Sequence, residues 1–324
     1  MTIGAFCVTR RYESRLWGGT QMASWLGVVD APADFAESWQ VYNDNTITTG
    51  QYRGLTLRAL VARHRAALVG ARSYERYGDD FPLLAKFIDA GQALSVQVHP
   101  DDMYAHTHEA HTGFHGKTEA WYIIGTQPNS DVIHGLNAPL TRDAYAAAIA
   151  DGTLTKHLRH VPIQPGDTID VPAGTIHAIN AGVFLFEIQQ TSDLTYRVYD
   201  YLRRDDQGNL RTLHIPQALA VSHLGSSVAA HSTPVVLGVG HEELVRSAYF
   251  VMERISTAHT QQWTRNADSF EILTLIDGAC VLSDALGTHL LQRGDSIIIP
   301  ADSPPYQIAP TNSATWLRCW VPDA

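Results

Sequence analysis

The sequence predicts a mostly β protein built from two related β units. Apolar and polar residues alternate along Leu94–His99, and short apolar runs bounded by glycine and proline recur along the chain. Two distant blocks also share one pattern, residues 119–125 with 165–174 and residues 269–278 with 293–302. We therefore expect a first domain with helical segments over residues 1–230 and a second β domain over residues 231–324.

The segments before the first motif are expected to form β structure, a helix and a buried strand. Residues 1–49 mix aromatic residues with turns, which is typical of β structure packed on a main body. Apolar residues recur at helical spacing over residues 56–68, and this helix should end near Gly70. The short apolar run 82–88 reads as a strand that contains Lys86. Two further helices are expected over residues 141–158 and 215–223.

The run Leu94–Asp102 is the first candidate site. As a strand it sends Leu94, Val96 and Val98 to one face, and Ser95, Gln97 and His99 to the other. An amide oxygen and an imidazole two residues apart can reach one metal ion, and Pro100 with two aspartates then ends the strand. A histidine in a strand also serves as a hydrogen-bonded core residue, so this run alone leaves both interpretations open.

The next strand adds polar groups to the same region. Residues 116–125 read as a strand on which Lys117, Glu119 and Trp121 share a face. Before it, residues 104–115 contain four histidines, and we interpret this tract as a solvated loop rather than as a metal site.

Residues 165–179 form the second candidate site. This block predicts a turn at Gly166, a strand up to Pro172, a second turn at Gly174 and then His177. The glycines permit the tight turns that direct the histidine inward. Further on, an extended chain over residues 187–197 would bring Glu187, Asp193 and Arg197 onto one face, unless a bulge or turn changes the register.

The second block keeps the framework of the repeat but not its polar residues. Pro304, Pro305 and Tyr306 stand where a histidine equivalent to His177 would fall, and no Gln-x-His motif precedes Glu271. We therefore predict that residues 231–324 bind no metal.

Composition excludes several classes of protein. The 324 residues carry a formal net charge of −10 without a basic run, which argues against nucleic-acid binding. No apolar run approaches the roughly 20 residues that a membrane span needs, and no signal peptide is predicted. Three widely separated cysteines fit a reducing compartment, so we expect a cytoplasmic protein.

The spacing Gly-x5-Pro-x-Gly-x2-His is typical of cupins, which are double-stranded β-helix (jelly-roll) proteins. Over nearly its whole length the chain resembles the short bacterial form of the type I mannose-6-phosphate isomerases. The motifs that carry the resemblance are Gln-Val-His-Pro-Asp-Asp, Gly-Lys-Thr-Glu-Ala-Trp-Tyr-Ile, Val-Pro-Ala-Gly-Thr-Ile-His-Ala and Thr-Ser-Asp-Leu-Thr-Tyr-Arg-Val-Tyr-Asp. The fold implied is a cupin catalytic domain with helical insertions, followed by a degenerate cupin-like domain.

The resemblance also implies a reaction and a site. The reaction is the interconversion of mannose 6-phosphate and fructose 6-phosphate, with a sugar phosphate as the small-molecule partner. One zinc ion per chain would be held at the matching positions, which are Gln97, His99, Glu119 and His177. Arg197 matches the catalytic arginine.

The isomerisation moves a proton between adjacent sugar carbons through an enediolate that a cation stabilises. We assign the developing charge to Arg197, proton transfer to Lys117 or Glu187, and assistance in ring opening to Asp193. A lysine must lose its proton before it can act as a base, and burial near a metal favours this loss. For substrate binding we expect Ser95, Lys86, Lys117 and Arg197, so two roles compete for Lys117.

Two alternative functions are compatible with the same set of metal ligands. An iron(II) cupin oxygenase would need no set like Lys117, Asp193 and Arg197 around the metal, and a sugar-binding cupin without turnover would be expected to carry a DNA-binding or partner module. Ligand types alone also allow iron, manganese or nickel. A monomer and a homodimer are both compatible with the sequence.

Overall fold

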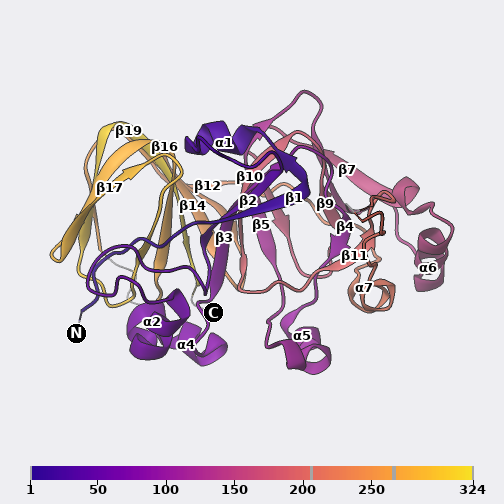
Figure 1. Ribbon diagram of the computed structural model, residues 1–324, viewed down its shortest axis with the longest axis horizontal. Coiled ribbons are helices and arrows are strands. Elements are labelled where there is room, and N and C mark those ends of the chain that lie inside the picture. The colour runs from indigo at the N-terminus through magenta and orange to yellow at the C-terminus, as the bar shows by residue number, and fades with distance from the viewer. Residues whose placement is uncertain (1, 205–206, 265–267, 323–324) are drawn as a thin grey trace.

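The computed structural model describes residues 2–204, 207–264 and 268–322. They form three antiparallel sheets with a few short helices, as the prediction of a mostly β fold requires (Figure 1). The predicted β structure in residues 1–49 is confirmed, although a short helix, α1 (Gln21–Leu26), lies between its two strands.

Two sheets enclose the region that holds the predicted site. The first has the strand order β1-β2-β3-β10-β5-β8. Its members are β1 (Arg11–Gly19), β2 (Phe35–Val41), β3 (Leu83–Ala90), β10 (Val183–Gln190), β5 (Glu119–Thr126) and β8 (Thr168–Val171). The second has the order β11-β4-β9-β6-β7, with β11 (Tyr196–Tyr199), β4 (Val96–Val98), β9 (His177–Ile179), β6 (Asp131–Leu136) and β7 (Leu158–Pro162).

The inner faces of these two sheets pack against each other. Trp121 and Leu185 of the first sheet share one buried cluster with Val132 and Ile179 of the second. The opposite face of the second sheet is covered by α6 (Arg142–Ala150) and α7 (Ile215–Val221), which cover Val96 and Val98. Alternation along β4 therefore holds for Val96, Gln97 and Val98. Leu94 departs from it, because the strand begins only at Val96 and Leu94 packs on the inner side.

Two predicted helices differ from the structure in length. Thr56 caps the helix expected over residues 56–68, but the chain breaks at Arg65, which has φ +52°, into α2 (Leu57–His64) and α3 (Ala66–Val69). A further helix, α4 (Ala71–Tyr77), follows Gly70. The helix expected over 141–158 starts correctly at its Thr141 cap but ends at Ala150, since Gly152 turns with φ +74°. A 3-10 turn, η2 (Leu154–His157), and β7 take up the remaining residues.

The histidine tract is not a loop. Asp101 accepts a hydrogen bond from the amide of Tyr104 and caps α5 (Asp102–His108), and the 3-10 turn η1 (Ala110–Thr112) follows. The aspartates that end the preceding strand therefore also start a helix. The prediction of a loop was wrong, whereas the expected exposure to solvent holds for His106, His108 and His111 but not for the buried His115.

The third sheet is formed by strands from Val235 onward and lies at one end of the molecule (Figure 1). Its order is β12 (Val235–Gly238), β13 (His241–Arg246), β14 (Val251–Thr257), β19 (Tyr306–Trp320), β16 (Glu271–Asp284) and β17 (Gly287–Gln292). In addition β15 (Gln261–Trp263) pairs with β19, and β18 (Ser296–Ile299) pairs with β16.

The predicted internal repeat is confirmed by matching backbone contacts. Glu119 on β5 opposes Val171 on β8, and Glu271 on β16 opposes Ile299 on β18. Before β8, the amide of Gly166 donates to Ile123 O at 2.8 Å, and before β18 the amide of Gly294 donates to Leu275 O at 2.7 Å. Both glycines have positive φ, of +95° and +91°. The same turn and strand pairing thus occurs twice.

One apolar core joins the third sheet to the rest of the chain. It contains Phe186 of the first sheet, Leu60 of α2 and Phe270 beside β16, and the rings of Phe81 and Phe270 are centred 4.4 Å apart. Residues before β1 also reach the third sheet, where Phe6 and Ile298 exchange two backbone hydrogen bonds. The boundary at residues 230 and 231 stays a prediction. In the described part of the chain, no helix is long and apolar enough to cross a membrane.

Candidate metal centre and active-site cavity

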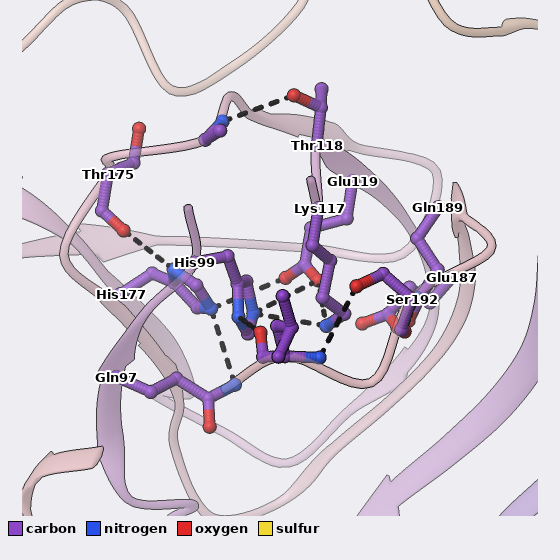
Figure 2. Close-up of polar contacts among 12 residues, drawn as sticks. Gln97, His99, Lys117, Thr118, Glu119, Thr175, His177, Glu187, Gln189 and Ser192 are labelled. Carbon is purple, nitrogen blue, oxygen red and sulfur yellow. Dashed lines mark hydrogen bonds and ion pairs between the residues drawn. The ribbon is translucent and has the colours of Figure 1, made fainter. Parts of the chain in front are cut away.

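Three side chains predicted as metal ligands converge between the first two sheets. His99 follows β4, Glu119 begins β5 and His177 begins β9. The Nε2 atoms of His99 and His177 each lie 3.4 Å from a different oxygen of Glu119. All three side chains are buried, and Figure 2 shows them pointing toward one another. The ends of these three strands therefore bring residues that are distant in the sequence to one point.

The backbone fixes which imidazole nitrogens face this point. His99 Nδ1 lies 2.8 Å from the carbonyl oxygen of Leu194, and His177 Nδ1 lies 2.8 Å from that of Thr175. Since a carbonyl only accepts, each Nδ1 carries the proton and each Nε2 presents a lone pair toward the carboxylate of Glu119. Lone pairs facing one another at this distance favour a cation beside them, which Lys117 supplies on the His99 side, and backbone carbonyls behind histidine ligands are a common feature of metal sites.

The charge states of the three side chains agree with cation binding. Burial lowers the pKa of His99 to about 3 and also lowers that of His177, so both imidazoles are neutral at pH 7. Burial alone would raise the pKa of Glu119, but the nearby Lys117 ammonium holds it well below its usual range. Among the described residues Glu119 Oε1 has no hydrogen-bond partner. Two neutral nitrogens and one carboxylate are a donor set that suits a divalent transition metal.

Gln97 and Lys117 complete the surroundings of this centre. Gln97 opposes His177 in the pairing of β4 with β9, and its amide nitrogen lies 3.3 Å from His177 Nε2. A rotation of the amide would bring its oxygen to the same point. Lys117 Nζ lies 2.6 Å from Glu119 Oε2 and 3.0 Å from His99 Nε2. The ammonium group therefore occupies one side of the centre.

The glycine-framed turn before His177 holds both histidines. Gly174 has φ +84°, and a Cβ atom there would come within 2.7 Å of the His223 ring. Its amide donates to the carbonyl of His99 at 2.8 Å. This confirms that the spacing of Gly174 and His177 has a structural cause, because only glycine fits this close turn.

A cavity of about 310 Å³ opens beside the centre. It is lined by seven of the residues predicted for the site, which are Lys86, Ser95, Gln97, Lys117, Glu187, Asp193 and Arg197. His99, Glu119 and His177 lie buried behind this lining. The expected extended run over residues 187–197 is interrupted, because β10 ends at Gln190 and Gln189 turns its amide to the carbonyls of Gln190 and Ser192. Glu187, Asp193 and Arg197 nevertheless reach the same cavity.

One wall of the cavity is a network of buried charges. Lys86 Nζ lies 3.0 Å from Glu187 Oε1 and 3.3 Å from Glu37 Oε1, and the indole of Trp121 donates to Glu187 Oε2. Burial opposes the charge on Lys86, but Glu187 and Glu37 outweigh it and raise its pKa. Burial and the charge of Glu119 raise the pKa of Glu187 despite the lysine. This wall therefore holds a permanent cation beside a carboxyl group that binds a proton readily.

Arg197 reaches the cavity from the second sheet, where β11 pairs it with Gln97. Its Nη1 donates to the carbonyl of Thr212, while its Nε is buried without a hydrogen-bond partner among the described residues. Burial and the nearby guanidinium of Arg211 lower its pKa. A donor of this kind is available to an anionic ligand.

Ten of the lining residues were not predicted as site residues, among them Arg15, Glu37, Trp39 and Arg211. Glu37 and Trp39 alternate along β2, so the strand pattern contained a signal for a shared face. Nothing in the sequence marks Arg15 or Arg211, which reach the cavity only through the folding of distant segments.

The equivalent position in the third sheet is filled by the protein itself. Glu271 accepts hydrogen bonds from Arg318 Nη2 at 2.6 Å and from the hydroxyl of Tyr306, and Arg318 also reaches Glu253 at 3.0 Å. Tyr306 is one of the residues that replace the second histidine of the repeat. The Arg318 guanidinium thus neutralises Glu271 and Glu253 in the third sheet. This pairing supports the prediction that residues 231–324 bind no metal.

The two sheets that face each other around this centre define a cupin fold, and the third sheet repeats part of it. Residues 6–128 match the family model "Phosphomannose isomerase type I, catalytic domain", and residues 241–314 match "Mannose-6-phosphate isomerase, cupin domain". The chain belongs to the type I phosphomannose isomerase family.

Individual relatives agree with this assignment. The chain is 35% identical over 301 residues to mannose-6-phosphate isomerase ManA of Bacillus subtilis, covering 89% of this chain and 90% of the relative. It is also 35% identical over 296 residues to mannose-6-phosphate isomerase of Streptococcus mutans, with coverage of 89% and 90%. A crystal structure of mannose 6-phosphate isomerase from B. subtilis superimposes with a TM-score of 0.87 at 31% identity, covering 98% of this chain and 99% of that one. The predicted family and fold class are confirmed, and the oxygenase and the binding protein without turnover are not supported.

Proposed function

We propose that this chain interconverts mannose 6-phosphate and fructose 6-phosphate at the cavity between its first two sheets. The observation that carries the proposal is the buried Glu119 carboxylate, which faces two imidazole lone pairs directly behind a cavity lined by cations. The relatives named above support the choice of substrate. A hexose phosphate is an anion, and Lys86, Lys117, Arg197 and Arg211 give this cavity the charge to bind it.

We assign the metal site to His99, Glu119 and His177, with Gln97 as the weakest ligand, and we propose zinc as the ion. A bound divalent ion would act as a Lewis acid for the sugar oxygens. Gln97 is placed last because its amide nitrogen, not its oxygen, faces His177, and within the described part of the chain no partner directs the oxygen to the centre.

Proton transfer is assigned to a group on the cavity wall. The base removes the proton from C2 of the aldose, and the same proton is returned to C1 to give the ketose. Glu187 is supported by its raised pKa and its rigid position between Trp121 and Lys86. Lys117 is supported by its place between the cavity and the centre, but its contacts with Glu119 and His99 keep its ammonium engaged. We therefore prefer Glu187 as the carrier and Lys117 as a substrate-binding cation.

The remaining residues bind and orient the substrate. Arg197 can donate its free Nε to the oxygen on which negative charge develops. Asp193 is exposed at the rim of the cavity, where it can take a proton from the ring hydroxyl during ring opening. Ser95 and Lys86 provide a hydroxyl and a permanent cation for the sugar phosphate.

The experiment that tests the proposal is a coupled assay that follows formation of fructose 6-phosphate from mannose 6-phosphate. We expect turnover with the metal-loaded protein, loss after treatment with a chelator, and recovery when zinc is added back. Glucose 6-phosphate, which differs at C2, serves as the control substrate. Activity that survives complete removal of metal would contradict the proposed site, and no activity on mannose 6-phosphate would contradict the proposed function.

A further inference from the structure

The histidine tract contains a second cluster of metal-ligating side chains that the isomerase site does not use. Asp102 and His106 lie one turn apart on α5, and His115 comes back to them after η1. Each offers one ligand atom, and these atoms all lie within 4.8 Å of one another. We call these three residues the α5 cluster. The helix itself projects from the edge of the two site sheets (Figure 1).

The two imidazoles of the α5 cluster face each other through nitrogen atoms. His106 Nε2 lies 3.1 Å from His115 Nδ1, and the ring of His115 is held edge-on against Tyr77 at a centroid distance of 4.8 Å. The other nitrogen of His115, Nε2, lies 3.8 Å from an oxygen of Asp80. This carboxylate favours a proton on Nε2 and leaves the lone pair of Nδ1 directed at His106.

Asp102 is held in place independently of the histidines. Its Oδ1 accepts from the amide of Gly116 and from Gln190 Nε2, both at 2.9 Å, and its Oδ2 accepts from Arg76 at 2.7 Å. A carboxylate has about four acceptor positions, so one remains on Oδ2. The carboxylate therefore keeps a free acceptor position beside the two imidazoles without depending on them for its own placement.

We infer that the α5 cluster is a second site for a divalent transition metal, distinct from the isomerase centre. Two imidazole nitrogens with one carboxylate select zinc-like ions over calcium or magnesium, which prefer oxygen ligands. Three protein ligands leave a position for water, and His106 is exposed, so the site binds more weakly than the buried centre.

The position of the α5 cluster gives such an ion a structural role. His115 and Asp102 both adjoin the segment that delivers Lys117 and Glu119, since Asp102 binds the amide of Gly116 and Ser192 Oγ donates to the carbonyl of His115 at 2.7 Å. An ion here would tie α5 to this segment. The inference does not depend on the identity of the isomerase substrate.

Zinc titration of the full-length protein tests the second site. Metal content at equilibrium with buffered free zinc should reach two ions per chain in the unaltered protein. His106→Ala removes an exposed ligand with little risk to folding and should weaken the second ion by at least the ~10- to 100-fold that loss of a supporting residue costs at metal sites. His111→Ala removes a histidine of the same tract outside the α5 cluster, and it should keep two ions.

A variant of the isomerase centre separates the two sites. His177→Ala should retain one ion, and His177→Ala with His106→Ala should retain none at the same free zinc. Hydrogen exchange at the amides of α5 should slow when the second ion binds to the unaltered protein and stay unchanged in His106→Ala. A single ion per chain in the unaltered protein overturns the inference. Equal weakening by His106→Ala and His111→Ala would identify nonspecific binding by the tract and overturn it as well.

Discussion

Lys86 on β3 and Glu187 on β10 are directly paired across the first sheet, and Lys86 Nζ lies 3.0 Å from Glu187 Oε1. The lysine also faces Glu37, so two carboxyl groups share one ammonium in a buried wall. Burial and the charge of Glu119 raise the pKa of Glu187, whereas Glu187 and Glu37 overcome burial and raise that of Lys86. The wall therefore pairs a fixed cation with a carboxyl group whose raised pKa favours binding a proton.

Glu187→Gln tests this division of roles. The amide keeps the size of the side chain and can still accept from Trp121, but it cannot carry the proton. We expect kcat for mannose 6-phosphate to fall by roughly 10²- to 10⁴-fold, as for other general bases, with zinc content unchanged. Lys117→Met is the matched comparison and should act mainly on KM. If the two variants show the reverse pattern, Lys117 is the proton carrier.

The outline of the fold and most of the site could be predicted from the sequence because local patterns determine them. Alternation of apolar and polar residues around Gln97 indicates a strand with polar side chains on one face. Position 174 must be glycine because a Cβ atom there would clash with the His223 ring. The helix after Thr141 was predicted too long, because a glycine such as Gly152 can either stay in a helix or end it. The helix in the histidine tract was missed, because an aspartate such as Asp101 can belong to a turn or cap a helix. Arg15 and Arg211 reach the cavity through distant segments, and no local pattern contains that information.

His177→Ala should empty the proposed metal centre. His99 and Glu119 would then hold the ion with only the weak ligand Gln97 beside them, without the third buried donor. We expect activity to be lost and zinc at this centre to fall well below one ion per chain, because loss of a direct ligand weakens binding by at least the ~10- to 100-fold that loss of a supporting residue costs. Elemental analysis after dialysis measures this directly. Because the α5 cluster is proposed to bind a second ion, His106→Ala should be the background for the measurement. Stoichiometric zinc in that double variant would refute the ligand assignment.

The stability of the protein should fall as pH rises through the titration of Asp170. Burial raises the pKa of this carboxyl to about 6, and its Oδ1 has no hydrogen-bond partner among the described residues. Between about pH 4 and pH 6 the folded chain keeps a proton on Asp170 that the unfolded chain has lost. The contribution of this proton to the free energy of unfolding is therefore present at low pH and lost above pH 6.

Asp170→Asn removes that titration. At pH 8 the variant should be more stable than the unaltered protein, by on the order of 1–3 kcal/mol for a shift of this size. At pH 4 the two should be equal, which serves as the internal control. Denaturant unfolding at both pH values measures the difference. A stability gain that does not change with pH would show that packing, not charge, explains the substitution.

Phe270→Ala should destabilise the whole chain rather than the third sheet alone. The ring is buried against Phe81 in the core that joins the third sheet to α2 and the first sheet. Removing a buried phenylalanine costs about 3–5 kcal/mol. We expect one unfolding transition at lower temperature, with loss of activity coinciding with loss of β structure. Leu290→Ala, on an exposed position of β17, should change stability by less than about 0.5 kcal/mol. Two separate transitions would instead show that residues 231–324 unfold as an independent domain.

Arg197→Ala decides whether this guanidinium acts on the reacting atoms or on the phosphate. Arg197 is anchored through Nη1 to Thr212 and directs a free Nε into the buried interior. A guanidinium keeps its proton during the reaction, so it can stabilise a developing oxyanion without taking part in proton transfer. If it acts on that charge, kcat should fall by roughly 10²-fold or more, with KM and zinc content nearly unchanged. If it binds the phosphate, KM should rise instead, and Arg197→Lys should recover much of the binding because a lysine supplies the same point charge. Steady-state kinetics on mannose 6-phosphate separate the two roles, and a variant with unaltered kcat and KM would remove Arg197 from the site.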